Sequence, residues 1–445
     1  MMKELLANKI ENKTMTVGVI GLGYVGLPLA VAFSSAGYQV VGFDIDTEKV
    51  SQLNNGNSYI IDISDDALKT ELASGFQATT DFSLLAEMDA ISICVPTPLT
   101  KAQTPDISYI ESAVSQINTY KRPGQLITLE STTYPGTTEE LIERIFEQES
   151  YVVGVDYFLC FSPERVDPGN PVYNTKNTPK VIGGTTFACT ALGKKLYEQV
   201  IPNMVAVSSP KVAEMSKLIE NTFRSINIAF VNELAMLSDT IDVDVWEAIE
   251  AAGTKPFGFM KFQPGPGIGG HCIPLDPMYL SWKAKESNFY SSFIDLAQEI
   301  NRLMPEVVIE KANDTLNTAK KALNGSRVLL LGVAYKQDID DVRESPALEI
   351  YELLQERGAV VDVMDPFVAT FRDAHGNTVE TTNDTAYGDY DLAIMLTPHS
   401  AFDLPEIAAK SQLVLDTKNA FNAIEATNVY TMGKMAKNKQ VPVYK

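Results

Sequence analysis

The strongest constraint on the fold is a glycine-rich turn between two predicted strands near the start of the chain. Thr16–Ile20 has the composition of a buried parallel strand and runs directly into Gly-Leu-Gly-Tyr-Val-Gly at residues 21–26. An apolar helix at residues 27–36 and a strand at Gln39–Phe43 follow, and this strand ends in Asp44. Strand, glycine turn, helix and a strand with an acidic end form the dinucleotide-binding unit of α/β proteins. The chain is therefore predicted to begin with a doubly wound parallel sheet.

This unit favours NAD as the ligand. The glycines let a pyrophosphate approach the helix N-terminus, whose N–H groups and dipole attract anions. Asp44 would bind the ribose hydroxyls, and its carboxylate repels a 2′-phosphate, so NAD is favoured over NADP. Lys49 lies close enough to weaken that preference. The predicted cofactor-binding residues of the unit are Gly21, Gly23, Tyr24, Val25, Gly26, Asp44 and Lys49.

Polar residues follow the ends of three further predicted strands. These strands are residues 89–95, 125–129 and 152–161. Ligands bind beyond the carboxyl ends of strands in open α/β sheets, so Thr97, Thr132 and Glu164 are candidate site residues. Ordinary turn or capping chemistry explains Thr97 and Thr132 equally well. The cluster of Glu164 with Pro163 and Arg165 is the more suggestive of the three.

A long helical segment follows this first α/β part. Residues 211–241 contain no Pro or Gly and are predicted to form one helix. Lys217 and Asn221 are one turn apart on it and share a face. A helical lysine is usually a solvated surface group, but Lys217 lies in an apolar-periodic segment and can face a cleft instead. Helices are predicted as far as residue 323, and an all-helical middle favours a spine with a dimer interface over a monomeric linker.

The last part of the chain repeats the α/β pattern. A strand at residues 327–332, a helix at Pro346–Glu356 and a strand at Val360–Met364 ending in Asp365 predict a second Rossmann-like domain without the full glycine fingerprint. Local positive charges for an anionic ligand are Lys336, Arg343 and Lys418. The predicted fold is α/β, with two Rossmann-like doubly wound domains joined by a long-helix central domain. The predicted boundaries are 1–208, 209–322 and 323–445.

Between the long helix and the second α/β part lies a cysteine in an unusual setting. Residues 264–277 contain four glycines and four prolines, which favours a shaped loop over a helix or strand. Cys272 at its centre would be a rigidly held nucleophile with backbone N–H groups nearby. Asp276 follows four residues later, so one helical turn would put a carboxylate beside the thiol. The competing interpretation is a buried cysteine in a packed connection.

Composition excludes several classes of function. The net charge of −21 over 445 residues disfavours nucleic acid and anionic membranes as partners. The 4 cysteines form no CxxC pair, no apolar run can span a membrane, and the first 15 residues lack a signal peptide, so we expect a cytoplasmic protein. The 3 histidines (His271, His375 and His399) lack metal-ligand spacing, so no metal site is predicted.

These motifs, taken in order, resemble the UDP-glucose/GDP-mannose dehydrogenase family of nucleotide-sugar 6-dehydrogenases. The resemblance covers nearly the whole chain and rests on residues 19–28, 95–97, 130–132, 162–165, Lys217 with Asn221, 269–276, 335–336 and 343–346. It implies that a sugar C6 alcohol is oxidised twice with NAD⁺, through a thiohemiacetal and a thioester on a cysteine, before water releases the carboxylate.

The resemblance also implies roles for individual residues. Cys272 would be the nucleophile, Lys217 and Asn221 would hold the C6 oxygen, Glu164 would be the base for the hydrolytic water, and Asp276 and Thr132 would orient water and Lys217. Thr97, Thr132 and Arg343 would contact NAD. The implied substrate contacts are Glu164, Arg165, Lys217, Asn221, Lys255, Gly267, Gly269, His271, Tyr335, Lys336 and Lys418.

Two departures from the UDP-glucose enzymes bear on the substrate. Leu275 stands where those enzymes carry lysine, and Pro168 stands where they carry a second glutamate. The segments at residues 162–171 and 254–259 are similar to the branch acting on UDP-N-acetylhexosamines, above all to the UDP-N-acetylglucosamine 6-dehydrogenases of bacterial surface-polysaccharide pathways. The mannosamine and galactosamine epimers and UDP-glucose remain alternatives. A two-electron NAD enzyme with a structural Cys272, and a non-catalytic nucleotide-binding regulator, are the competing functional classes.

Overall fold

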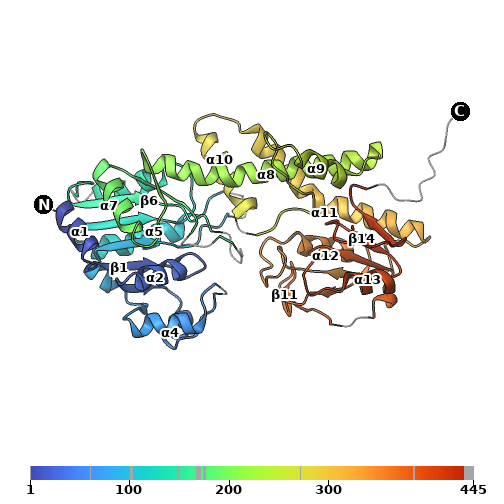
Figure 1. Cartoon of the computed structure of the whole chain (residues 1–445), viewed down its shortest axis with the longest axis horizontal. Coiled ribbons are helices and arrows are strands. Elements are labelled where there is room, and N and C mark those ends of the chain that lie inside the picture. Colours follow the sequence, from blue (N-terminus) through green and yellow to red (C-terminus); the bar gives the residue numbers. More distant parts are fainter. Residues whose placement is uncertain are drawn as a thin grey trace. The chain divides into compact units, whose positions relative to one another are not determined.

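The computed structural model describes residues 2–60, 62–100, 104–147, 151–166, 172–173, 177–270, 272–383 and 386–434. The chain divides into two compact units (Figure 1). The first unit comprises Met1–Glu220 and Met278–Phe289, and the second comprises Asn221–Pro277 and Tyr290–Lys445. The predicted domain boundaries at 208 and 322 stay a prediction.

The first unit is built on one large sheet. Its strands are β1 (Thr16–Ile20), β2 (Gln39–Phe43), β3 (Gln77–Thr79), β4 (Ala90–Ile93), β5 (Gln125–Leu129), β6 (Tyr157–Phe161), β7 (Lys180–Gly184) and β8 (Met204–Val207). They form an 8-stranded sheet in the order β3-β2-β1-β4-β5-β6-β7-β8. All neighbours are parallel except β6 and β7, which are antiparallel.

Helices cover both faces of this sheet. They are α1 (Met2–Glu11), α2 (Gly26–Ser35), α3 (Thr47–Asn54), α4 (Asp65–Ala73), η1 (Phe82–Glu87), α5 (Ser108–Tyr120), η2 (Thr138–Glu143), α6 (Arg144–Glu147) and α7 (Phe187–Tyr197). Successive residues of β6 enter opposite cores, as the period of a strand requires. Phe158 belongs to the same buried cluster as Phe33 of α2, whereas Leu159 belongs to the cluster that contains Ile110 of α5. The unit is therefore doubly wound.

The second unit carries a smaller sheet. Its strands are β9 (Arg327–Leu331), β10 (Val360–Met364), β11 (Thr370–Arg372), β12 (Thr378–Glu380), β13 (Leu392–Met395), β14 (Val414–Asp416) and β15 (Val429–Thr431). The main sheet has 5 parallel strands in the order β10-β9-β13-β14-β15, and β11 and β12 form a separate antiparallel pair.

Helices also cover both faces of the second sheet. The remaining helices of the chain are α8 (Pro210–Ile241), α9 (Val245–Gly253), α10 (Cys272–Glu286), α11 (Ser292–Thr318), α12 (Pro346–Glu356), η3 (Tyr387–Asp389) and α13 (Leu404–Lys410). Leu330 of β9 belongs to the same buried cluster as Val308 of α11, and its neighbour Leu331 belongs to the cluster that contains Ile407 of α13. The predicted fold class, with two Rossmann-like units and long central helices, is confirmed.

An acidic residue ends the second strand of each unit. In the second unit Asp365 follows β10, and its two carboxylate oxygens accept N–H groups from Val333, Ala334, Phe367 and Val368 at 2.7–3.0 Å. The Nε2 atom of His399 lies 3.0 Å from the same carboxylate, while its Nδ1 accepts the N–H of Asp338. Asp365 therefore fixes the turn that follows β9.

The loop prediction for residues 264–277 is wrong from Cys272 onward, because α10 begins there. Pro274 lies in the first helical turn, where no intrahelical N–H bond is required. Pro277 lies further inside and removes one such bond, which the rest of this 15-residue helix tolerates. The sequence pattern also fails to predict α1, β7 and β8, and it starts β6 at residue 152 instead of Tyr157. Among the described residues, no helix combines the length and apolarity needed to cross a bilayer.

Candidate active site

The glycine turn after β1 leaves room for a ligand at its backbone. Gly21 has a φ of +88°, a left-handed conformation that favours glycine. A Cβ atom at Gly26, the first residue of α2, would lie 1.8 Å from the carbonyl oxygen of Gly21, so the helix begins in contact with the turn. A Cβ at Gly23 would meet no atom within 4 Å. The N-terminus of α2 therefore lies beside an open stretch of backbone, which fits a dinucleotide pyrophosphate.

Asp44 is tied to this turn. Its carboxylate accepts the N–H of Leu22 at 2.9 Å and the N–H of Asp46 at 3.0 Å. The hydroxyl of Tyr59 donates to the carbonyl oxygen of Leu22 at 2.7 Å, and the Nζ of Lys49 lies 5.9 Å from the centre of the Tyr59 ring. Each oxygen of Asp44 accepts one of these bonds and keeps a further lone pair, so the acidic end of β2 fits a ribose diol.

The segments after β4 and β5 are also held in place. Thr97 is buried, and its carbonyl oxygen accepts the hydroxyl of Tyr279 at 2.5 Å. The hydroxyl of Ser131 donates to the carbonyl oxygen of Val95 at 2.7 Å, which joins the two segments. Thr132 follows and is half-buried. Both threonines thus lie at the carboxyl edge of the sheet, where ligands of α/β domains bind.

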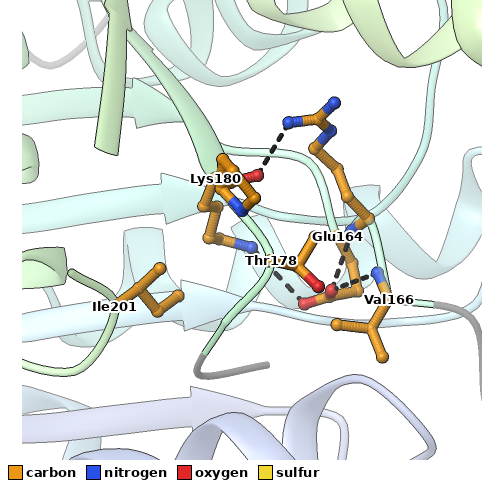
Figure 2. A pocket seen from close by; sticks show the side chains of 7 residues that line it. Glu164, Val166, Thr178, Lys180 and Ile201 are labelled. Carbon is orange, nitrogen blue, oxygen red and sulfur yellow. Dashed lines mark hydrogen bonds and ion pairs between the residues drawn. The ribbon is translucent and has the colours of Figure 1, made fainter. Parts of the chain in front are cut away.

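Glu164 follows β6 and has a well-defined environment (Figure 2). Its Oε1 accepts the N–H groups of Arg165 at 2.7 Å and Val166 at 2.8 Å. Its Oε2 lies 3.5 Å from the Nζ of Lys180, the first residue of β7. The same Nζ donates to Glu130 Oε2 at 2.7 Å, so one buried ammonium group contacts two carboxylates.

Charge decides the ionisation of Glu164. Burial alone would raise its pKa, but the charge of Lys180, the two N–H groups and the charge of Lys217 together hold the pKa below its usual value. Burial prevails at Glu130, whose pKa is raised despite its bond to Lys180. Glu164 is therefore ionised at neutral pH and can accept a proton.

Arg165 points away from the carboxylate of Glu164. Its Nη2 lies 2.7 Å from Glu220 Oε1, and its Nη1 donates to the carbonyl oxygen of Pro179 at 2.7 Å. This side chain spans from the loop after β6 to α8, on which Lys217 is 9% exposed. The low exposure supports the interpretation that Lys217 does not point into bulk water.

In the second unit, Cys272 and Asp276 lie one turn apart on α10. Cys272 is exposed at the first position of the helix, where the helix dipole favours negative charge. Asp276 is 2% exposed and accepts the side-chain amide of Asn221 at 2.5 Å. The structure therefore brings together Asn221, Asp276 and the helix that starts with the predicted nucleophile.

The other three cysteines are buried: Cys94, Cys160 and Cys189. Burial raises the pKa of the Cys94 and Cys160 thiols well above the usual value. Cys272 is thus the exposed thiol of the chain, and the buried-cysteine interpretation does not apply to it.

The glycines before Cys272 let the loop pack closely on the second sheet. A Cβ at Gly269 would lie 2.5 Å from the Cβ of Tyr335, and a Cβ at Gly265 would lie 2.4 Å from the Nζ of Lys418. Gly267 has a φ of +135°, and the N–H of Gly270 donates to the carbonyl oxygen of Arg343 at 2.9 Å. Predicted substrate-binding residues from three parts of the sequence therefore meet at this loop.

Two asparagines that the sequence analysis missed anchor this loop. Asn232 accepts the N–H of Gly265 at 2.9 Å, and its amide donates to the side chain of Asn301 at 3.0 Å. Asn301 in turn donates to the carbonyl oxygen of Ser225 at 3.1 Å. Their only sequence signal is an amide on the apolar face of a long helix.

The basic residues of the second unit differ in their surroundings. Lys418 is half-buried, and burial lowers its pKa to about 8. Arg343 pairs with Asp341 at 2.6 Å, and Lys336 is half-buried. Lys255 is exposed, with its Nζ 4.9 Å from the centre of the Phe257 ring. Lys418 is therefore a basic side chain whose positive charge a bound anion would stabilise.

The predicted site residues divide between the two units. The first unit holds Gly21, Gly23, Tyr24, Val25, Gly26, Asp44, Lys49, Thr97, Thr132, Glu164, Arg165 and Lys217. The second holds Asn221, Lys255, Gly267, Gly269, Cys272, Asp276, Tyr335, Lys336, Arg343 and Lys418, while His271 lies outside the described residues. In the described part of the chain, no group of three or more His, Cys, Asp or Glu side chains could hold a metal ion.

Three family models match the chain in order. They are the NAD binding domain, the central domain and the UDP binding domain of the UDP-glucose/GDP-mannose dehydrogenase family, over residues 15–201, 211–303 and 329–423. The chain belongs to this family and is a nucleotide-sugar dehydrogenase. The predictions of the family and of NAD as cofactor are confirmed.

Similar proteins act on several amino sugars. The chain is 36% identical over 390 residues to the UDP-N-acetyl-D-mannosamine dehydrogenase of Pyrococcus horikoshii, covering 87% of this chain and 90% of that protein. It is 35% identical over 392 residues to the UDP-N-acetyl-D-glucosamine 6-dehydrogenase of Pseudomonas aeruginosa, covering 88% and 92%. The solved structure of the UDP-D-ManNAc dehydrogenase from Pyrococcus horikoshii has a TM-score of 0.87 at 32% identity, covering 95% of this chain and all of that one.

The glycine turn gives a prediction with a matched control. Gly26→Ala forces a Cβ against the backbone oxygen of Gly21, so we expect the melting temperature to fall by roughly 5 °C and NAD binding to be lost. The new Cβ in Gly23→Ala meets no protein atom within 4 Å, so the melting temperature should equal that of the wild type and only the affinity for NAD should fall. Differential scanning fluorimetry and NAD titration check this. Equal losses of stability in both variants would contradict it.

Lys418 gives a pH-dependent prediction. Its pKa of about 8 means that the ammonium form loses its proton as pH rises through that value. Since the charged form binds an anion, UDP affinity should be steady below pH 8 and fall up to about tenfold per unit above it. Calorimetric UDP titrations between pH 6.5 and 9.5 measure this. Lys418→Met should weaken UDP binding and abolish the fall in affinity above pH 8. Lys410→Met, on exposed α13, should leave that fall unchanged.

Proposed function

We propose that this chain oxidises the C6 alcohol of a UDP-N-acetylhexosamine, with UDP-N-acetylglucosamine favoured, to the uronic acid in a four-electron reaction. The observation that carries the proposal is the exposed Cys272 at the N-terminus of α10, with the buried Asp276 one turn later and hydrogen-bonded to Asn221. A thiol in this setting can add to a carbonyl carbon, which a two-electron alcohol dehydrogenase does not need.

In this mechanism the glycine turn at residues 21–26 and Asp44 would hold NAD⁺, which would supply the hydride acceptor for two successive oxidations at C6. Lys217 and Asn221 stabilise the negative charge that develops on the C6 oxygen. The Sγ of Cys272 adds to the aldehyde carbon, the oxygen takes up a proton, and a thiohemiacetal forms. Loss of the second hydride and of the hydroxyl proton gives a thioester on Cys272.

Hydrolysis completes the reaction. Glu164 takes a proton from water as the water oxygen adds to the thioester carbonyl. The C–S bond then breaks, the thiolate of Cys272 leaves, and the carboxylate product is released. Asp276 and Thr132 orient the water and Lys217. The ionised state of Glu164 supports this role.

The remaining predicted residues bind the substrate and cofactor. Tyr335, Lys336 and Lys418 meet the UDP, with Gly267, Gly269 and His271 in the adjoining loop. Arg165 and Lys255 contact the sugar, and Arg343 reaches NAD. The packing of the glycine loop on Tyr335 and Lys418 supports the assignment of the UDP contacts.

The choice of amino sugar rests on sequence differences. Leu275 replaces the lysine of the UDP-glucose enzymes, and Pro168, outside the described residues, replaces their second glutamate. Relatives of this chain act on UDP-N-acetyl-D-glucosamine and on UDP-N-acetyl-D-mannosamine at nearly equal identity. The product would supply a cytoplasmic pathway for surface-polysaccharide precursors.

We also propose that two copies pair through α8. Phe223, Phe230, Leu237 and Ile241 recur at helical spacing on this helix and are 46–57% exposed. Apolar residues that form a continuous stripe on one helix favour a self-complementary interface with a second copy.

NADH yield tests the proposed reaction. Wild-type protein should form about two NADH per UDP-N-acetylglucosamine, whereas Cys272→Ser should stop after the first oxidation because its oxygen cannot form a labile thioester. A panel with UDP-N-acetylmannosamine, UDP-N-acetylgalactosamine and UDP-glucose identifies the sugar. One NADH per sugar with an active Cys272→Ser variant would contradict the thioester mechanism. Preference for another sugar would overturn the substrate assignment and leave the proposed mechanism in place.

The proposed pairing is tested by Phe230→Glu. A charge in the apolar stripe should shift the protein toward monomer in sedimentation or light scattering, because it cannot be buried without a partner. Phe187→Glu, on an exposed phenylalanine of α7, is the control and should leave the mass unchanged. A wild-type monomer at micromolar concentration would refute the pairing.

A further inference from the structure

A buried ion cluster in the first unit joins Lys180 and Glu130 to Glu164, the base of the proposed mechanism. Lys180 lies between two carboxylates, with its Nζ 2.7 Å from Glu130 and 3.5 Å from Glu164. The side chains of Lys180 and Glu130 are 4% and 0% exposed, and that of Glu164 is 17% exposed. Glu164 is thus the member of the cluster that reaches toward solvent.

The end of the cluster away from solvent is anchored to the sheet and a helix. Tyr197 of α7 donates its hydroxyl to Glu130 Oε1, and Ser92 Oγ of β4 lies 2.9 Å from the same hydroxyl. Glu130 Oε2 accepts from Lys180, so both of its oxygens have a partner. Lys180 also donates to the carbonyl oxygen of Pro163 at 3.1 Å. The three protons of its ammonium group therefore match three acceptors.

The two oxygens of Glu164 have different surroundings. Oε1 accepts two backbone N–H groups, from Arg165 and Val166, and has no further lone pair to offer. Oε2 faces Lys180 at the longer distance of 3.5 Å and keeps acceptor capacity. Figure 2 shows this carboxylate in a small pocket that Lys180, Thr178 and Ile201 also line. The geometry thus leaves one oxygen of Glu164 for a proton from outside the cluster.

We propose that Lys180 is a positioning residue that holds Glu164 ionised and oriented for proton abstraction from the hydrolytic water. The inference rests on the proposed function, because Glu164 is the base only if a thioester is hydrolysed. Glu130 and Tyr197 have the second task of keeping the buried ammonium group in place. A structural ion pair would need only Glu130 and Lys180, and would not need to face the candidate base.

The charges around Glu164 come from several elements. Lys180 of β7 and Lys217 of α8 stabilise the ionised carboxylate of Glu164, and so do the N–H groups of its own loop. Glu130, after β5, opposes them. The guanidinium of Arg165 is directed to Glu220 of α8. The charge of Lys180 therefore acts on both Glu130 and Glu164. Changing Lys180 or Glu130 should shift the pH at which Glu164 titrates.

Two variants that share the substitution Glu130→Gln test this in opposite directions. In Glu130→Gln alone, the whole charge of Lys180 acts on Glu164. The acid limb, which is the fall in the rate of thioester hydrolysis on the acidic side of its pH profile, should therefore move to lower pH. In Glu130→Gln/Lys180→Met, no buried charge is left unpaired, and the acid limb should move up by about one pH unit or more. Lys180→Arg retains the charge and should keep the wild-type limb.

The measurement follows the acyl group on Cys272 directly. The protein is mixed with NAD⁺ and the UDP-N-acetylhexosamine that the wild type oxidises fastest, quenched at intervals between pH 5 and 9, and analysed by intact mass. Circular dichroism and melting temperature confirm that each variant is folded. If the double variant does not fold, the shift in Glu130→Gln alone decides.

Each outcome has one meaning. Opposite shifts in the two variants support the role of Lys180. An unmoved acid limb in the folded double variant, or in Glu130→Gln when it decides alone, overturns the role. Glu164→Gln provides the separate check on the proposed function and should accumulate the acyl-enzyme. If Glu164→Gln hydrolyses it at the wild-type rate, the base has been misassigned and the inference about Lys180 fails with it.

Discussion

The hydrogen bonds between a carboxylate at the end of one strand and the N–H groups after its neighbour organise both units. Asp44 accepts the N–H of Leu22 in the first unit, and Asp365 accepts those of Val333 and Ala334 in the second. The two carboxylates differ in the hydrogen-bond acceptor capacity that they have left. Asp44 keeps acceptor capacity for a ribose, whereas Asp365 also binds two further N–H groups and His399. The same strand pair can thus present a nucleotide site in one unit and a closed structural joint in the other.

Burial of charge is the second constraint on the first unit. Lys180 lies inside a protein whose formal net charge is −21, and it contacts two carboxylates. Removing one partner of a buried ion pair typically costs about 3–5 kcal/mol, because the other charge is left without compensation. Exposed pairs such as Lys410 with Glu406 contribute less than about 1 kcal/mol. The arrangement around Glu164 is therefore among the parts of the unit least tolerant of single substitutions.

Sequence reasoning succeeds where one local pattern determines the structure. The bounds of β1, β2, β5, β10 and α12 match the predictions because apolar period, glycine and cap agree there. It fails where partners are distant in the chain. Lys180 and Glu130 are fifty residues apart, and a lysine beside a proline gives no local sign of burial. Asn232 and Asn301 likewise meet only in the folded unit. The helix that starts at Cys272 is missed because Pro274 and Pro277 suggest a loop. A first helical turn accepts proline, and a long helix tolerates one further inside.

The distribution of cysteines has a consequence for the lifetime of the protein. Three thiols are buried, and Cys272 is exposed at a helix start. Oxidants such as peroxide react first with accessible thiols, so damage falls on Cys272 before it reaches any other cysteine. Sulfenic acid at this position is reversible by cellular thiols, but further oxidation is not. If Cys272 has the catalytic role proposed for it, activity in a cell would then follow the redox state of its surroundings even while the fold stays intact.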